Sequence, residues 1–359
     1  ERNMKKGVRS ALWIIGTPLV LAALGIWGYG YYTTSAFDRE MPPVWRAGFT
    51  EKKATVNGSV MNYAEGPKNG PALLLLHGQA VDWKNYRKVL PELSKHFHVY
   101  AVDYYGHGQS TRVPEKYRAV AIGRDLQQFI KQVIGEPVIV SGHSSGGLLS
   151  AWLGANAPAE VRGVVLEDPP LFTTLLPRAK KTWNYHDLAT TTHHFLQQEN
   201  SANGEKDFII YNVAHSPMYQ LFGGLQSRML SDTRKQRQQH PTRPVKYTYM
   251  PPIVNEMLRG LNSYDPQFGE AFYTDNWDEG FDHTATLENI NVPTVLIHTR
   301  MDYDQNGILR AAMDDQEAQR AASLLKRVHF VKVNTGHGFH DEKPRDFIQL
   351  LLDFKKRLN

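Results

Sequence analysis

Short runs of apolar residues alternate along this chain with segments in which apolar residues recur every three or four positions. The pattern predicts strands at 49–56, 59–64, 72–76, 98–102, 137–140, 161–166, 293–297 and 328–333, and the apolar run at 72–76 predicts a buried one. Helical spacing is found at 84–95, 123–134, 148–155, 314–326 and near the C-terminus. Because strands that alternate with helices pair in parallel through crossovers, the sequence predicts an α/β fold, with a mostly parallel central sheet flanked by helices.

The alternation of strands and helices is interrupted between about residues 170 and 285. This stretch is rich in aromatic residues and lacks a sustained apolar strand. We therefore expect a mostly helical cap, inserted into the domain that forms the sheet. The predicted organisation is an N-terminal anchor at 1–40, a core in two parts at 41–169 and 286–359, and the cap at 170–285.

The N-terminal segment contains 22 consecutive residues, 11–32, without a charge. At about 1.5 Å per residue, a transmembrane helix of this length crosses the hydrocarbon core of a bilayer. Lys5, Lys6 and Arg9 precede the run, so the positive-inside bias predicts a cytoplasmic N-terminus and an extracytoplasmic main domain. We expect a single-pass protein of the cell membrane. The alternative is a cleaved signal peptide with its cleavage site at 34–36, although the apolar run is longer than signal peptides use.

Composition narrows the possible chemistry. The chain of 359 residues is 41% hydrophobic and 21% charged, a balance typical of a globular protein. It contains no cysteine, which excludes disulfides, thiolate catalysis and Cys-ligated zinc. Its net charge of +5 is mild, so nucleic acid is not an expected partner. A basic run at 228–246 is interpreted either as a solvated helix face or as a surface for anionic lipid headgroups.

One motif carries most of the functional information. Residues 142–146 read Gly-His-Ser-Ser-Gly, a G-x-S-x-G sequence between the apolar strand at 137–140 and the helix at 148–155. This context predicts a sharp turn on which Ser144 is strained, with the two glycines leaving room where a Cβ would collide. The Ser144 hydroxyl would then project beside a helix N-terminus, where developing negative charge is favoured. We predict that Ser144 is a nucleophile.

Three further motifs accompany this sequence, in the order found in the α/β-hydrolase superfamily, which the chain resembles. They are an apolar strand ending in His-Gly at 73–78, a D-x-x-G-H-G-x-S turn at 103–110, and a histidine loop that begins at 335. The resemblance covers about 45–170 and 286–359. It implies the α/β-hydrolase fold and an enzyme of the serine esterase or lipase type, but it does not specify the substrate.

The resemblance also implies the other members of a catalytic triad and its oxyanion hole. His337, in the histidine loop, would act as the general base. The backbone N–H groups of Gln79 and Ser145 would form the oxyanion hole. The acid that orients the histidine would follow the late strand, which indicates Asp302, although Thr299 stands where the family usually has Gly.

Other carboxylates remain open as the acid. Asp304 lies two residues beyond Asp302, and Glu167 and Asp168 follow the sixth predicted strand, where some members of the superfamily carry their acid. A separate S-x-x-K sequence at 323–326 lies within a predicted helix and is interpreted as structural.

We expect a carboxylic ester hydrolase that works through an acyl-enzyme on Ser144, with neither metal nor cofactor. Trp83, His143 and His340 are predicted to bind the substrate. The cap's aromatic residues would form its own core and roof an apolar pocket, which favours a lipid or lactone ester. They are Trp183, Tyr185, Phe195, Tyr211, Tyr219, Phe222, Phe268, Phe272, Tyr273 and Trp277. The alternatives are a C–C bond hydrolase or perhydrolase of the same fold, and a ligand-binding receptor with slow turnover.

Overall fold

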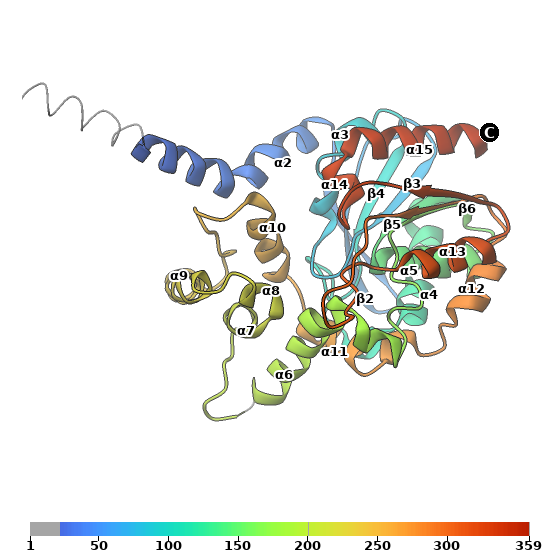
Figure 1. Cartoon of the computed structure of the whole chain (residues 1–359). Helices are drawn as coiled ribbons and strands as arrows, with labels where there is room; N and C mark the ends of the chain where they lie inside the picture. The colour runs from blue at the N-terminus through green and yellow to red at the C-terminus, as the bar shows by residue number, and fades with distance from the viewer. Residues whose placement is uncertain (1–21, 200, 359) are drawn as a thin grey trace, which may run out of the picture.

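The computed structural model describes residues 22–199 and 201–358 and contains an eight-stranded sheet (Figure 1). Its strands are β1 (Thr50–Val56), β2 (Ser59–Glu65), β3 (Ala72–Leu76), β4 (His98–Asp103), β5 (Val138–His143), β6 (Val161–Glu167), β7 (Thr294–His298) and β8 (Val328–Lys332). They lie in the order β1-β2-β4-β3-β5-β6-β7-β8. Pairings that involve β1 or β2 are antiparallel, and all the others are parallel. The prediction of a mostly parallel sheet is confirmed.

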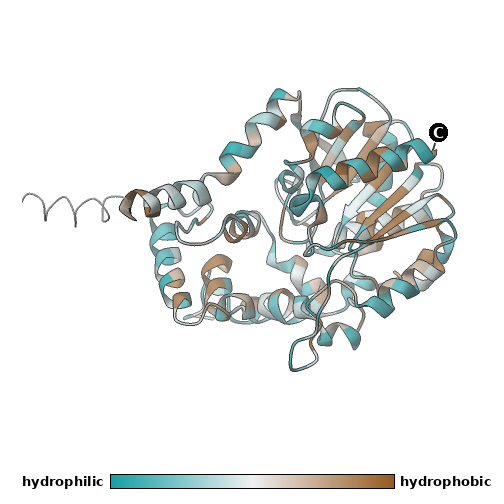
Figure 2. Ribbon diagram, turned by 45° about the horizontal axis from the view of Figure 1, so that its top comes forward, coloured by the Kyte–Doolittle hydropathy of each residue, from teal (hydrophilic) through white to brown (hydrophobic). Residues whose placement is uncertain are grey.

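The central strands β3, β4, β5 and β7 are buried on both faces, whereas the edge strands β1 and β8 are largely exposed. In β3, Leu74 and Leu76 pack into one hydrophobic core, whereas Leu73 and Leu75 pack into a second core on the opposite face. Successive side chains of a strand point to opposite faces, so a strand between two helical layers must be apolar at every position. Figure 2 shows this concentration of hydrophobic residues in the strands.

Helices cover both faces of the sheet. The face of Leu74 is covered by α4 (Ala119–Phe129), continued by η3 (Ile130–Ile134), and by α5 (Ser145–Asn156), α12 (His283–Asn289) and α13 (Asp315–Leu324). The face of Leu73 is covered by α2 (Ala36–Arg46), η1 (Trp83–Tyr86), α3 (Leu90–Leu93), α14 (Phe339–Glu342) and α15 (Pro344–Leu358). A short helix, η2 (Pro114–Lys116), precedes α4.

The prediction of one helix at 84–95 is wrong, because the chain forms the two short helices η1 and α3 there. Pro91 explains the interruption. It has no N–H to donate to the carbonyl of residue 87, so a continuous helix would lose a hydrogen bond and clash with that carbonyl. Pro91 instead occupies the first turn of α3, where proline is tolerated.

Between β6 and β7 the described residues form helices and no strand. The helices that precede α12 are η4 (Arg178–Lys181), η5 (Tyr185–Ala189), α6 (Thr190–Glu199), α7 (Phe208–His215), α8 (Pro217–Gln220), α9 (Leu225–Gln239), α10 (Pro252–Leu261), α11 (Pro266–Tyr273) and η6 (Asn276–Asp278). Figure 1 shows α7 to α10 to one side of the sheet, below the N-terminal helix. Most of the cap's aromatic residues, including Phe268 and Trp277, are buried. They belong to the same hydrophobic core as Leu74 of the sheet and not to a separate core of the cap, as the sequence had suggested.

The segment predicted to span a membrane lies half outside the described residues. Its last part belongs to a helix at 22–34 that leads, after a turn at Ser35, into α2. This helix exposes Leu24, Ile26 and Trp27, and its first turns are hydrophobic in Figure 2. Within 22–199 and 201–358, no helix combines the length and the apolar character needed to cross a bilayer.

Candidate active site

Ser144 stands on a sharp turn between β5 and α5. Its φ of 55° and ψ of −122° are strained for a residue with a side chain. The flanking glycines make the turn possible. A Cβ on Gly142 would lie 2.0 Å from the carbonyl oxygen of Gly146, and a Cβ on Gly146 would lie 2.2 Å from that of Leu76. The sharp turn that the G-x-S-x-G sequence predicts is therefore present, and both glycines are sterically required.

His337 is held by a buried carboxylate, which belongs to Asp168. His337 lies in the loop between β8 and α14, and its Nδ1 is 2.6 Å from Oδ2 of Asp168, directly after β6. Since the carboxylate accepts this bond, Nδ1 carries the proton, and Nε2 is the nitrogen that can accept one. Within the described residues, neither Nε2 nor the Ser144 hydroxyl has a hydrogen-bond partner, and both side chains line the same cavity.

The charges of this pair support each other. Burial raises the pKa of Asp168, but the nearby imidazole of His298 and the hydrogen bonds from His337 and Thr299 outweigh it and hold the pKa well below its usual range. Desolvation lowers the pKa of His337, but the hydrogen bond and charge of Asp168 outweigh this and raise the pKa above 6.5. Asp168 is therefore an ionised carboxylate that stabilises positive charge on His337.

Asp302, the expected acid, lies elsewhere. It is 55% exposed and forms an ion pair with Arg310 at the surface, and Asp304 accepts hydrogen bonds from nearby backbone N–H groups of its own loop. The chain after β7 leads toward the cap, where Leu309 bonds to the backbone of Lys181. The prediction that Asp302 contacts His337 is wrong, and Asp168, one of the open alternatives, occupies that position.

Two backbone N–H groups are available beside Ser144. Those of Gln79 and Ser145 donate to no described residue, and both residues line the cavity of Ser144. Their side chains are engaged elsewhere: Gln79 Nε2 donates to the Tyr264 hydroxyl at 2.7 Å, and Ser145 Oγ is 2.8 Å from the hydroxyl of Tyr104. Ser145 begins α5, so its N–H also has the favourable field of a helix N-terminus.

His143 and Trp83, predicted to bind the substrate, are buried outside the cavity. His143 Nε2 donates to the carbonyl oxygen of His337 at 2.9 Å, so it supports the histidine loop. Burial lowers the pKa of His143 to about 3, which keeps it neutral. Trp83 packs in the core under η1 and donates Nε1 to Glu51 at 3.0 Å. The prediction that these two residues bind the substrate is wrong. Nearness to the site in sequence does not determine which way a side chain points.

His340 is also buried away from the cavity. Its Nδ1 lies 2.8 Å from Glu167 Oε1, and its Nε2 lies 2.8 Å from Asn85 Oδ1. A second imidazole–carboxylate pair therefore lies directly beside that of His337 and Asp168. Glu167 immediately precedes Asp168 in the chain, and His340 follows His337 by three residues. It joins the end of β6 to the histidine loop, and thus fixes the two segments that bring Asp168 and His337 together.

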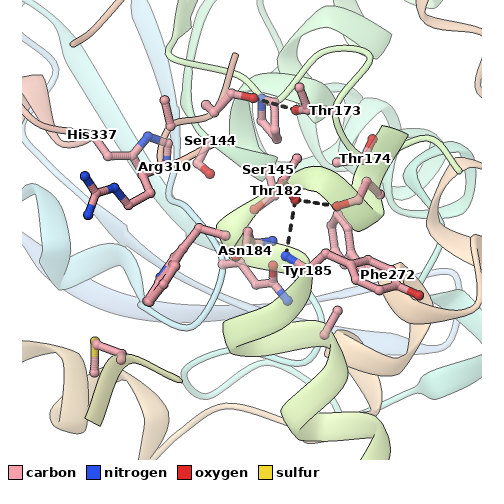
Figure 3. A pocket seen from close by; sticks show the side chains of 18 of the residues that line it. Ser144, Ser145, Thr173, Thr174, Thr182, Asn184, Tyr185, Phe272, Arg310 and His337 are labelled. Atoms are coloured by element: carbon pink, nitrogen blue, oxygen red, sulfur yellow. Dashed lines mark hydrogen bonds between the residues drawn. The ribbon is translucent and has the colours of Figure 1, made fainter. Parts of the chain in front are cut away.

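Ser144 and His337 open into a cavity of about 380 Å³ between the sheet and the cap (Figure 3). Tyr185 and Phe272 of the cap face it from the opposite side. Its apolar lining is Pro170, Ala179, Trp183, Tyr185, Ala189, Met218, Leu221, Phe272, Ala311 and Ala312. Its polar lining is Gln79, Ser144, Ser145, Thr173, Thr174, Thr182, Asn184, Arg310 and His337. Sequence reasoning missed Met218, Leu221 and Arg310, which carry no motif.

Within 22–199 and 201–358, no group of three His, Asp or Glu side chains is arranged to hold a metal ion. A hydroxyl on a strained turn, an imidazole with one free nitrogen, and two free N–H groups, one of them at a helix start, are the components of acyl transfer.

Comparison with known proteins finds a match to the alpha/beta hydrolase fold family over residues 71–344. The magnesium-chelatase 30 kDa subunit of Rhodobacter capsulatus is 34% identical over 94 residues, or 26% of this chain and 33% of that protein. The pimeloyl-[acyl-carrier protein] methyl ester esterase of Nitrosospira multiformis is 27% identical over 165 residues, or 41% of this chain and 61% of that protein. The chain thus spans between a third and three fifths of these relatives' length. A bacterial membrane phospholipase A has a similar structure, with a TM-score of 0.61, 20% identity and 98% of both chains covered.

Proposed function

Because the chain belongs to the alpha/beta hydrolase fold family, we propose that this hydrolase cleaves carboxylic esters with an apolar acyl group, through an acyl-enzyme on Ser144. One observation carries the proposal. Ser144, on its strained turn, and His337, oriented by the buried carboxylate of Asp168, line one largely apolar cavity. The relatives' names include an esterase that acts on a methyl ester, which agrees with this class of reaction.

The proposed reaction proceeds in two halves. In the first, Ser144 Oγ attacks the ester carbonyl while His337 Nε2 takes the hydroxyl proton, and this proton then leaves with the alcohol. The N–H groups of Gln79 and Ser145 hold the oxyanion, and Asp168 stabilises the imidazolium. In the second half, water gives a proton to His337 and attacks the acyl carbon, and the proton returns to Ser144 as the acid leaves. Such hydrogen bonds often tighten only when substrate is bound, which accounts for the unpaired Ser144 hydroxyl.

The cavity supports an acyl group that is apolar and of moderate size. A volume of about 380 Å³ lies near the lower end of the roughly 300–1,000 Å³ that small-molecule sites occupy. Leu221 lines it and is 71% exposed, so an apolar side chain marks its mouth. Burying an alkyl chain there is favourable by about 0.8 kcal/mol for each CH₂ group. We expect lipid-like esters or lactones to be hydrolysed faster than short, charged esters.

The test combines covalent labelling with turnover. The wild type and Ser144→Ala are treated with a fluorophosphonate and assayed on p-nitrophenyl esters of increasing chain length. Ser323→Ala is the matched control, since Ser323 is exposed on α13 and bonds only within its own helix. We expect the wild type and the control to label and turn over, with a preference for medium chains, and Ser144→Ala to do neither. Labelling of Ser144→Ala, or binding without turnover by the wild type, would refute the proposed enzyme.

We also propose that the N-terminal segment holds the protein on a membrane. Support comes from the uncharged run at 11–32 and from the exposed Leu24, Ile26 and Trp27 of the helix at 22–34. On the adjoining helix α9, Arg228 lies beside this helix, and Arg234 and Lys235 are exposed without a described partner. Flotation of the full chain with vesicles tests the proposal. We expect co-flotation that survives carbonate washing in the wild type and is lost in Leu24→Lys/Ile26→Lys. Equal recovery of both chains in the aqueous fraction would contradict it.

A further inference from the structure

Two consecutive residues at the end of β7 face the buried carboxylate of Asp168. Thr299 donates its hydroxyl to Oδ2 at 2.8 Å and its N–H to Oδ1 at 3.3 Å. The ring nitrogen Nδ1 of His298 lies 3.7 Å from the same Oδ1. With the 2.6 Å bond from His337, these contacts place Asp168 between two imidazoles. One of them opens to the cavity and the other lies within the fold.

His298 is linked on its other side to a surface ion pair. Its Nε2 lies 2.8 Å from Oδ1 of Asp315, the first residue of α13. Asp315 also pairs with Lys332 of β8 at 2.8 Å. The side chain of His298 is only 1% exposed, whereas that of Asp315 is 47% exposed. Both nitrogens of this buried ring therefore face carboxylate oxygens. Nε2 donates a hydrogen bond to Asp315, whereas Nδ1 has no hydrogen-bond partner among the described residues and lies 3.7 Å from Asp168, within the range of a strong charge–charge attraction. A ring between two carboxylates is stabilised as the imidazolium.

We infer that His298 is a positioning residue that holds a positive charge against Asp168 and so sets the pH at which His337 becomes an effective base. This inference rests on the proposed function. The cation offsets part of the negative charge that Asp168 exerts on His337. His337 then loses its proton at a lower pH than it would beside an isolated carboxylate.

The groups around His298 favour its charge. They are Asp168 after β6, Asp315 on α13 and, behind Asp315, Lys332 on β8, while its chain neighbour Thr299 is neutral. Burial opposes the charge on His298, but the carboxylates of Asp168 and Asp315, the second of which is hydrogen-bonded to the ring, outweigh it and raise its pKa above 6.5.

The titratable groups around His337 come from the ends of β5 and β6 and from its own loop. Asp168 and Glu167 at the end of β6 raise its pKa, and Glu167 is itself paired with His340. His143 at the end of β5 contacts the ring at 4.5 Å between centroids but stays neutral, because burial lowers its pKa to about 3. Removing the positive charge of His298 should therefore change the pKa of His337.

The experiment is the pH profile of kcat/KM on p-nitrophenyl butyrate for the wild type, His298→Asn and Asp315→Asn. Loss of His298 leaves Asp168 unbalanced, so we expect the acid limb to move up by roughly 0.5–1 pH unit. Asp315→Asn removes one partner of the imidazolium, and a smaller shift in the same direction is expected. His329→Asn, which replaces an exposed histidine on neighbouring β8, is the matched control and should leave the profile unchanged.

The outcomes separate the inference from the function on which it rests. If the wild type neither labels with fluorophosphonate nor turns over, the proposed function fails. If it does both and the acid limbs of His298→Asn and Asp315→Asn coincide with that of the wild type, only the inference is overturned. Should His298→Asn fail to fold, Asp315→Asn decides, because its side chain is half exposed and its loss leaves the core intact.

Discussion

Replacing Asp168 by Asn tests whether Asp168, and not Asp302, is the carboxylate that orients His337. The carboxylate lies 2.6 Å from His337 Nδ1 and is fully buried. Two unit charges at that separation interact by about 6 kcal/mol at an effective dielectric constant near 20. Part of this is offset by desolvation, and an Asn also favours the wrong tautomer of the histidine. We expect kcat to fall by roughly 10³–10⁴-fold, or about 4–5.5 kcal/mol in activation free energy.

The matched variant is Asp302→Asn, which removes a half-exposed carboxylate paired with Arg310. Exposed ion pairs contribute roughly 0–1 kcal/mol, so kcat should change by less than about threefold. Both variants are assayed on p-nitrophenyl butyrate at saturating substrate, and near-ultraviolet circular dichroism checks that they fold. The reasoning is refuted if Asp302→Asn loses as much activity as Asp168→Asn, or if folded Asp168→Asn keeps most of it.

Three further results are expected. The pKa of His337 is raised above 6.5 and the base must be neutral, so kcat/KM should rise with pH through an apparent pKa above 6.5; a flat profile from pH 5 to 8 would contradict this. Gly142→Ala would bring a Cβ to 2.0 Å from a backbone oxygen, so we expect little folded protein. Thermal unfolding checks this against Gly135→Ser. Residue 135 has a positive φ, but a Cβ there meets open space. Arg259→Ala would leave buried Asp82, bonded to it at 2.6 Å and 2.8 Å, without its counter-ion, and should cost about 3–5 kcal/mol in urea unfolding; an unchanged midpoint would argue against that ion pair.

The strands were the part of the fold that the sequence predicted best. A strand between two helical layers has to be apolar at every position, so its bounds are visible in the pattern, and those predicted for β3 match the structure. Helix bounds were less accurate. The helix at 123–134 begins four residues earlier, at Ala119, and its first turn buries Ala119 and Ile122. A proline divided the one predicted at 84–95.

For the candidate site, local sequence predicted local geometry and little more. The glycines and the flanking strand and helix around Ser144 determine its turn by sterics alone, and they lie within five residues. The acid is different, because whether a carboxylate reaches His337 depends on how two separate loops leave the sheet. Asp302 satisfied the spacing of the family but follows a loop that leads to the cap. Thr299 departs from the family pattern, and this was the one sign in the sequence that the loop differs; in the structure Thr299 donates a hydrogen bond to Asp168.

Capture of the acyl-enzyme is the most direct measurement of whether Ser144 is the nucleophile. The wild type is mixed with a p-nitrophenyl ester, quenched with acid within the first turnover and digested for mass spectrometry. We predict that the peptide containing Ser144 gains the mass of the acyl group, and that the fragment ions assign the gain to Ser144 and not to Ser145. Turnover with no acylated peptide at any quench time, or acylation of another residue at the rate of turnover, would contradict the proposed mechanism.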